Sequence, residues 1–139
     1  MTTNADMTIY NQHLNAETKE VEYIPTVVSG VHWHSNLKVS VGENGLKGVS
    51  GISAAEVYKI RIPESAETEE KKYIEPRAYR HLPADESGQY WTIQKGDMFC
   101  KGATDMTLAE LKKSADFGTV LGIGDNRRGM NPHFRIGGA

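Results

Sequence analysis

The chain has 139 residues, a formal net charge of −2 and a pI near 6.2, so no overall positive charge draws it to nucleic acid or to an acidic membrane surface. Any contact with DNA would have to be local. The length suits one domain with a real core but leaves no room for a separate catalytic module. Its single cysteine, Cys100, excludes an internal disulfide, and no apolar run approaches the roughly 20 residues of a membrane span. We therefore expect a soluble domain made in a reducing compartment.

The first third of the chain predicts an arm followed by strands. Residues 1–20 are polar with scattered apolar positions, which indicates an N-terminal arm, and a single β-barrel domain is expected over residues 21–139. A strand begins that domain over residues 21–28, where Pro25 confines it to an edge of the sheet or breaks it. Apolar and polar residues then alternate with a period of two, which turns one face inward. The expected core positions in this part are Val31, Trp33, Leu37, Val39 and Val41.

Two loops flank the next predicted strand. The glycine-rich residues 42–53 lack periodicity and predict a loop. A strand follows over residues 55–62 and ends at Pro63. Its inward face would carry Tyr58, Ile60 and Ile62. Residues 64–72 are charged and nearly free of apolar side chains, so they predict a second loop that is exposed to solvent.

A tight β-hairpin over residues 90–102 is the strongest local signal. Residues 73–82 predict an extended segment before it, with bends at Pro76 and Pro83. In the hairpin, Trp91 and Ile93 share one face, and residues 94–97 supply the turn.

The last part of the chain predicts one helix and two strands. Thr107 and Glu110 form a capping box at the start of a helix of about two turns, which Gly118 would end. Strands are expected over residues 119–123 and 133–136, on either side of a turn. The elements together predict a mainly β fold: a small β-barrel or sandwich of about six to eight strands with one short helix and long loops.

No group of residues predicts a reaction, a cofactor or a metal site. His32 and His34 would project from one face of a strand, a geometry that a metal could use with a third ligand. No third ligand lies at a spacing that must bring it near, and a polar pair facing solvent is the more common role. Gly122 and Gly124 lack the third glycine of a dinucleotide fingerprint. We therefore expect a protein that is not an enzyme.

Arg127 and Arg128 form the one compact basic point of the chain. Their guanidinium groups could pair with carboxylates of an adjacent subunit, contact phosphate, or lie on a solvated turn without a partner. Asp125, just before them, is a turn-forming residue, so the backbone shape accounts for part of this sequence without any ligand.

Three motifs carry a resemblance to a known family. They are Gly-Val-His-Trp at residues 30–33, Trp-Thr-Ile-Gln-Lys-Gly-Asp at residues 91–97, and Asp-Asn-Arg-Arg-Gly at residues 125–129 followed by His133. In order and spacing they resemble a family of small structural proteins of unknown function. That family is encoded by long-tailed phages and prophages of Firmicutes, among the head-to-tail connection genes. The likeness covers most of residues 7–139.

The resemblance implies a virion protein of the neck, a head-completion (stopper) ring that joins the portal and adaptor to the tail and helps to retain packaged DNA. Its partners would be copies of itself in a homo-oligomeric ring, the portal and adaptor proteins, and tail-completion or tail-tube proteins. Contact with packaged double-stranded DNA would be passive, and the protein would enter the virion after assembly in the host cytoplasm. The alternatives are a tail-completion or tail-terminator protein and, less favoured, a soluble metal-binding module that uses His32 and His34.

The resemblance also implies which residues act in the neck. Such barrels place a long loop in the central channel, and residues 64–72 are a second candidate for that loop. The candidates in the first loop are Gly42, Glu43, Asn44, Gly45, Leu46, Lys47 and Gly48. The candidate interface residues are Asp125, Arg127 and Arg128.

Overall fold

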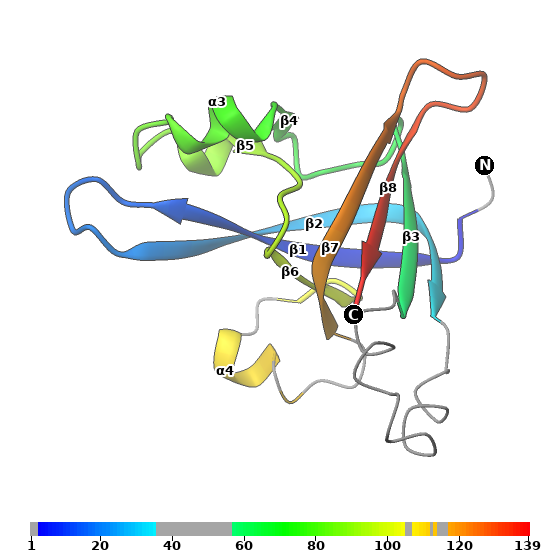
Figure 1. The fold of residues 1–139 in the computed structure, drawn as a ribbon, viewed down its shortest axis with the longest axis horizontal. Helices are drawn as coiled ribbons and strands as arrows, with labels where there is room; N and C mark the ends of the chain where they lie inside the picture. Colours follow the sequence, from blue (N-terminus) through cyan, green and yellow to red (C-terminus); the bar gives the residue numbers. More distant parts are fainter. Residues whose placement is uncertain (1–2, 36–56, 105–106, 112, 114–116) are drawn as a thin grey trace, which may run out of the picture.

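A closed barrel of antiparallel strands forms the body of the molecule (Figure 1). The computed structural model describes residues 3–35, 57–104, 107–111, 113 and 117–139. Around the barrel the strands are β1 (Ala5–Leu14), β2 (Val21–Ser35), β3 (Tyr58–Pro63), β8 (His133–Gly138), β7 (Phe117–Asn126) and β6 (Met98–Lys101), which pairs again with β1. The predicted mainly β fold with a small barrel is confirmed.

The arm expected over residues 1–20 is wrong, because Ala5–Leu14 of this segment form strand β1. Met7 and Ile9 on this strand are fully buried in the barrel. The opposite face of β1 is buried as well, where Tyr10 packs with Cys100 and Leu111 in a second, smaller core. Burial on both faces removes the alternation of apolar and polar residues that marks a half-exposed strand. For this reason the segment resembles an arm in sequence.

The β1–β2 hairpin is longer than the barrel that it joins (Figure 1). Strand β1 pairs with β6 only over Met7–Tyr10, and β2 pairs with β3 only over His32–Ser35. Residues 11–14 and 21–24 therefore pair with each other alone and project beyond the barrel.

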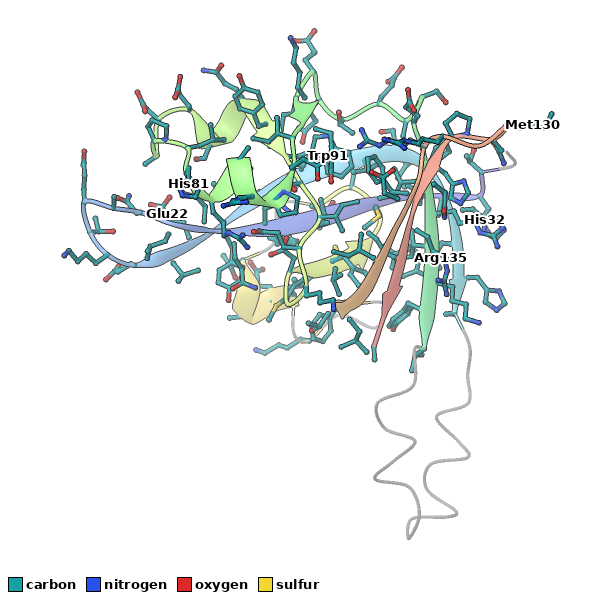
Figure 2. The ribbon with its side chains drawn as sticks, turned by 45° about the horizontal axis from the view of Figure 1, so that its top comes forward. Glu22, His32, His81, Trp91, Met130 and Arg135 are labelled. Carbon is teal, nitrogen blue, oxygen red and sulfur yellow. The ribbon has the colours of Figure 1, made fainter. Side chains whose placement is uncertain are left out.

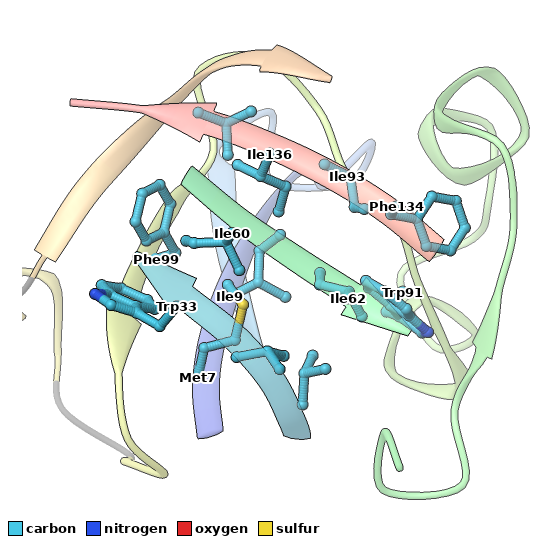
Figure 3. Close-up of a cluster of buried hydrophobic side chains, with 13 residues drawn as sticks. Met7, Ile9, Trp33, Ile60, Ile62, Trp91, Ile93, Phe99, Phe134 and Ile136 are labelled. Carbon is cyan, nitrogen blue, oxygen red and sulfur yellow. The ribbon is translucent and has the colours of Figure 1, made fainter. Parts of the chain in front are cut away.

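Apolar side chains fill the barrel interior from end to end (Figure 3). Trp33, Tyr58 and Phe99 pack edge-to-face at one end, with ring centroids 5.4 to 5.7 Å apart. A second aromatic cluster at the other end contains Trp91 and Phe134, and isoleucines lie between the two. The interior of a six-stranded barrel is narrow enough for side chains to close it completely.

The hairpin predicted over residues 90–102 does not form. Strand β5 (Tyr90–Trp91) pairs in parallel with β4 (Lys72–Tyr73), and β6 pairs with β1 and β7 instead. The predicted turn exists, since the Asp97 amide donates to the Gln94 carbonyl at 3.2 Å and Gly96 has a φ of +91°. Trp91 is drawn away from β6 because its ring completes the aromatic cluster with Tyr73 and Phe134.

Short helices lie outside the barrel. Helix α3 (Pro76–Arg80) replaces the extended segment expected over residues 73–82, because Pro76 sits in the first turn, where its missing amide hydrogen costs nothing. A 3₁₀ turn, η1 (Ser87–Gln89), follows it. The capping box of α4 (Leu108–Leu111) is present, with the Thr107 amide 3.1 Å from Glu110 Oε1 and the Glu110 amide 3.4 Å from Thr107 Oγ1. This helix has four residues, and Gly118 lies in β7 rather than at its end.

Of the remaining expectations, Val31 and Trp33 are buried as predicted, and Ile60 and Ile62 of β3 face the core. The predicted positions Leu37, Val39 and Val41 and the channel-loop candidates at residues 42–48 lie outside the described residues. Strands β7 and β8 each extend further than predicted, to Asn126 and Gly138.

The charged residues 64–72 are held against β2 rather than projecting freely into solvent. Ser29 and Glu67 exchange backbone hydrogen bonds of 2.8 and 3.3 Å. The Val27 amide donates to Glu69 Oε1 at 2.8 Å, and Lys71 Nζ donates to the Pro25 carbonyl at 2.7 Å. These contacts weaken the case for residues 64–72 as the channel loop.

Candidate functional site

The predicted interface residue Arg127 is engaged within its own chain. Its guanidinium forms a two-pronged pair with Asp125, with Nε 2.9 Å from Oδ1 and Nη2 2.8 Å from Oδ2. It also lies over the rings of Tyr73 and Phe134, with centroids at 5.1 and 4.7 Å, and 3.5 Å from a Glu75 oxygen. The hydrogen bond from Arg127 lowers the pKa of Asp125. Arg128, on the same turn, is exposed.

His32 and His34 lie where the sequence predicts, on the outward face of β2. They pair across the sheet with Arg61 and Lys59 of β3, which are cations rather than metal ligands. Among the described residues no three His, Cys, Asp or Glu side chains come together as a metal site.

A buried polar network at the base of the projecting hairpin was not predicted. Asp97 is fully buried, and its carboxylate accepts hydrogen bonds from Asn11 Nδ2 at 2.8 Å and from the Gln12 amide at 3.0 Å. Gln94 Nε2 lies 3.3 Å from both carboxylate oxygens. Burial nevertheless raises the pKa of Asp97 to about 6 against these hydrogen bonds, which lower it.

Asn11 extends this network to the backbone of the segment that follows β5. Its side-chain amide donates to the Thr92 carbonyl at 2.7 Å and accepts from the Thr92 amide at 3.1 Å, as a neighbouring strand would. Gln12 Nε2 also donates to the Gly96 carbonyl at 2.7 Å. The network thus fixes the hairpin where it leaves the barrel, which a solvated turn at residues 94–97 would not do.

His13 and Tyr79 continue the network toward helix α3. The His13 side chain is 2% exposed, its Nε2 lies 2.9 Å from the Leu82 carbonyl, and its ring meets that of Tyr79 edge-on at 5.4 Å. The Tyr79 hydroxyl is buried, and burial raises its pKa. Helix α3 is therefore packed onto the base of the hairpin.

A cleft of about 530 Å³ opens beside this network, between the hairpin, helix α3 and strand β7. Its lining includes Arg80 and Lys95 and three exposed apolar side chains. These are Leu14, Val21 and Ile123, which are 58%, 52% and 39% exposed. Leu14 and Val21 face each other across the last pair of the hairpin, and we call residues 14–21 the hairpin tip.

The hairpin tip and the cleft are the candidate interaction site. Large apolar side chains exposed together at the end of a projecting element are typical of a surface that another protein covers. The sequence signal was present, since Leu14 and Val21 flank the polar residues 15–20. The predicted N-terminal arm over residues 1–20 hides this signal, because an arm has no defined strand pairing.

These features define a small closed β-barrel with a clamped, projecting hairpin and an apolar tip. The chain belongs to the family described as Family of unknown function (DUF6751), whose model matches residues 1–139. No curated protein and no solved structure matches the chain significantly. No helix in the described part of the chain is long and apolar enough to cross a membrane.

Proposed function

We propose that this chain is a structural protein of the neck of a long-tailed phage virion, the subunit of a head-completion (stopper) ring between the portal and adaptor and the tail. The observation that carries the proposal is the hairpin tip, where Leu14 and Val21 are more than half exposed on an element that extends past the barrel. The buried network around Asp97 holds this element in place, so the tip is presented rigidly. A rigid apolar projection suits assembly with another subunit.

In such a ring the hairpin tip and the cleft beside it would together pack against the next subunit. The contact would be heterologous and would close by rotation. Leu14, Val21 and Ile123 line the same cleft and would present one apolar surface to that subunit. The cations Arg80 and Lys95 at the cleft would meet Glu17 and Glu20 of the tip, which gives the contact a defined orientation.

Residues 30–33, 91–97 and 125–129 resemble the family of unknown function encoded among head-to-tail connection genes, and this resemblance supports the same assignment. The connection between β2 and β3 starts and ends at one point of the barrel rim, because Ser35 and Tyr58 pair directly. A channel loop requires this arrangement, and we assign that role to the connection that contains residues 42–48. A tail-completion protein would carry more helix on its sheet, whereas α3 and α4 have five and four residues, which favours the stopper.

The test is assembly of a hairpin-tip variant with purified portal and adaptor. Leu14→Ser with Val21→Ser should abolish the complex seen by sedimentation velocity, because the apolar contact is lost while the barrel is untouched. Met130→Ser is the matched control, since Met130 is fully exposed on the β7–β8 turn, away from the hairpin tip.

The thermal unfolding midpoint of both variants should equal that of the wild type, because none of these side chains is in the core. An assembly that tolerates the tip variant as well as the control would contradict the proposal.

A further inference from the structure

The edge of strand β2 that faces away from β1 is covered by part of the charged loop. Farther along this edge, from His32 onward, β2 pairs with β3. Over residues 25–29 the hydrogen-bond partners come instead from residues 67–71, which we call the strap. Ser29 and Glu67 form an isolated antiparallel bridge, so the strap and the edge pair there as two strands would.

Side chains of the strap take the place of a backbone partner at two further positions. The Val27 amide donates to Glu69 Oε1 at 2.8 Å, and the Pro25 carbonyl accepts from Lys71 Nζ at 2.7 Å. Lys71 Nζ also donates to Thr26 Oγ1 at 2.9 Å. Holding two long charged side chains in one geometry costs rotamer entropy, which offsets part of what these hydrogen bonds contribute. The strap is therefore a weaker partner for the edge than a strand.

The backbone of the strap is strained at the same place. Glu69 and Glu70 have φ values of +57° and +64°, in the left-handed region that residues with a Cβ atom avoid. Such strain persists only where surrounding contacts hold the backbone in place. Here the contacts with β2 hold it, so we expect the strap to open more readily than the strands of the barrel.

The strand under the strap lacks the charges that commonly protect an edge. Residues 23–31 contain no charged side chain, and residues 26–28 are all β-branched. Figure 2 shows Glu22 on the projecting part of the hairpin and His32 on the opposite side of the molecule, so the uncharged stretch runs along most of β2. An uncovered edge of this kind is a template for pairing with another chain.

The edge is complementary to a second copy of itself about a twofold axis at Val27. Antiparallel pairing of two copies places Val27 opposite Val27 and Ser29 opposite Pro25. Each Val27 amide would donate to the Val27 carbonyl of the other copy, and each Ser29 amide to the other Pro25 carbonyl. Pro25 has no amide hydrogen, so it leaves no donor unpaired. A second copy therefore satisfies the edge with backbone groups alone.

We propose that the strap is an edge guard, which prevents two copies of this chain from pairing through β2 as a twofold dimer. Such a dimer uses the same patch on both copies, whereas a ring needs heterologous contacts, so the dimer would compete with ring assembly rather than contribute to it. The guard does not depend on the neck assignment, because it rests on the edge and the strap.

The experiment compares strap variants in the background of the hairpin-tip variant, which removes association through the tip. Glu69→Ala with Lys71→Ala deletes the side-chain contacts of the strap and keeps its backbone bridge to β2. In sedimentation velocity this strap variant should form a dimer as its concentration rises, whereas the parent stays a monomer. At low concentration its Val27 and Ser29 amides should exchange hydrogen at least roughly tenfold faster than in the parent, because hydrogen bonds to charged groups are lost.

Glu70→Ala with Lys72→Ala is the matched control, because it removes one carboxylate and one ammonium group from exposed neighbouring positions. This control should stay a monomer with the exchange rates of the parent. Adding Val27→Lys to the strap variant should restore the monomer, because two like charges then meet at the twofold axis.

Glu70→Gly tests the guard without removing its contacts with β2. Glycine adopts a φ of +64° without strain, so exchange of the Val27 and Ser29 amides should slow about threefold. A strap variant that stays monomeric, a dimer that survives Val27→Lys, a control that dimerises, or faster exchange in Glu70→Gly would overturn the proposal. None of these measurements uses portal or adaptor, so a failure of the neck assignment leaves the test intact.

Discussion

The pH dependence of stability offers a sharp test of the network at the base of the hairpin. Asp97 is fully buried, and burial raises the pKa of its carboxyl group to about 6, from an ordinary value of 3.8. The unfolded chain releases this proton near pH 3.8, whereas the folded chain holds it until about pH 6. The folded state therefore binds more protons between these two values, and stability falls as the pH rises through them.

The size of the effect follows from the two pKa values. Their difference corresponds to about 3 kcal/mol of unfolding free energy, because one pH unit is worth about 1.4 kcal/mol. This contribution is fully present below pH 3.8 and is lost above about pH 6. Asp125 acts in the opposite direction, because the Arg127 hydrogen bond lowers its pKa, so the wild-type profile alone does not isolate Asp97.

The assay is urea unfolding of the wild type and of Asp97→Asn across this pH range. Asn keeps the shape of the side chain and an oxygen for the Gln12 amide, but it does not titrate. The free energy of the wild type minus that of the variant should fall by about 3 kcal/mol from low to neutral pH. Asp85→Asn, which removes an exposed carboxyl group, is the matched control. A difference that stays constant with pH, or a carboxyl NMR titration of Asp97 with a midpoint near 3.8, would refute the reasoning.

Two further predictions concern the aromatic cluster that closes one end of the barrel. Trp91→Ala should lower the unfolding free energy by about 3 to 5 kcal/mol in urea, because the ring is 4% exposed and packs on Tyr73 and Phe134. A decrease in unfolding free energy below about 1 kcal/mol would mean that the Trp91 ring contributes little to the core. Arg127→Ala should lower the unfolding free energy by about 1 kcal/mol more than Arg128→Ala, because Arg127 lies over the rings of Tyr73 and Phe134. Equal losses of unfolding free energy in the two variants would show that the contact of Arg127 with the rings does not stabilise the fold.

The sequence predicts strands well where one face of the strand meets water. Trp33, Ile60 and Ile62 alternate with polar residues and lie in the core as expected. The capping box of Thr107 and Glu110 also forms, because its two residues satisfy each other locally. Local patterns of this kind need no knowledge of the rest of the fold.

The sequence does not predict strands that are buried on both faces, or pairing between residues that lie far apart along the chain. Strand β1 is covered on both faces, and two of its buried positions hold Asn11 and His13, whose hydrogen-bond partners come from residues about 70 to 80 positions away. Trp91 pairs with Tyr73 in a parallel ladder, and no turn in the sequence predicts this pairing.

Electron cryomicroscopy of DNA-filled virions from a strain that encodes this chain tests the proposed neck assignment most directly. The proposal predicts a ring of six-stranded barrels between the portal and the tail, with the hairpin tip and the cleft of each subunit packed against its neighbour. Virions that are complete and infectious but contain no copy of this chain would contradict it.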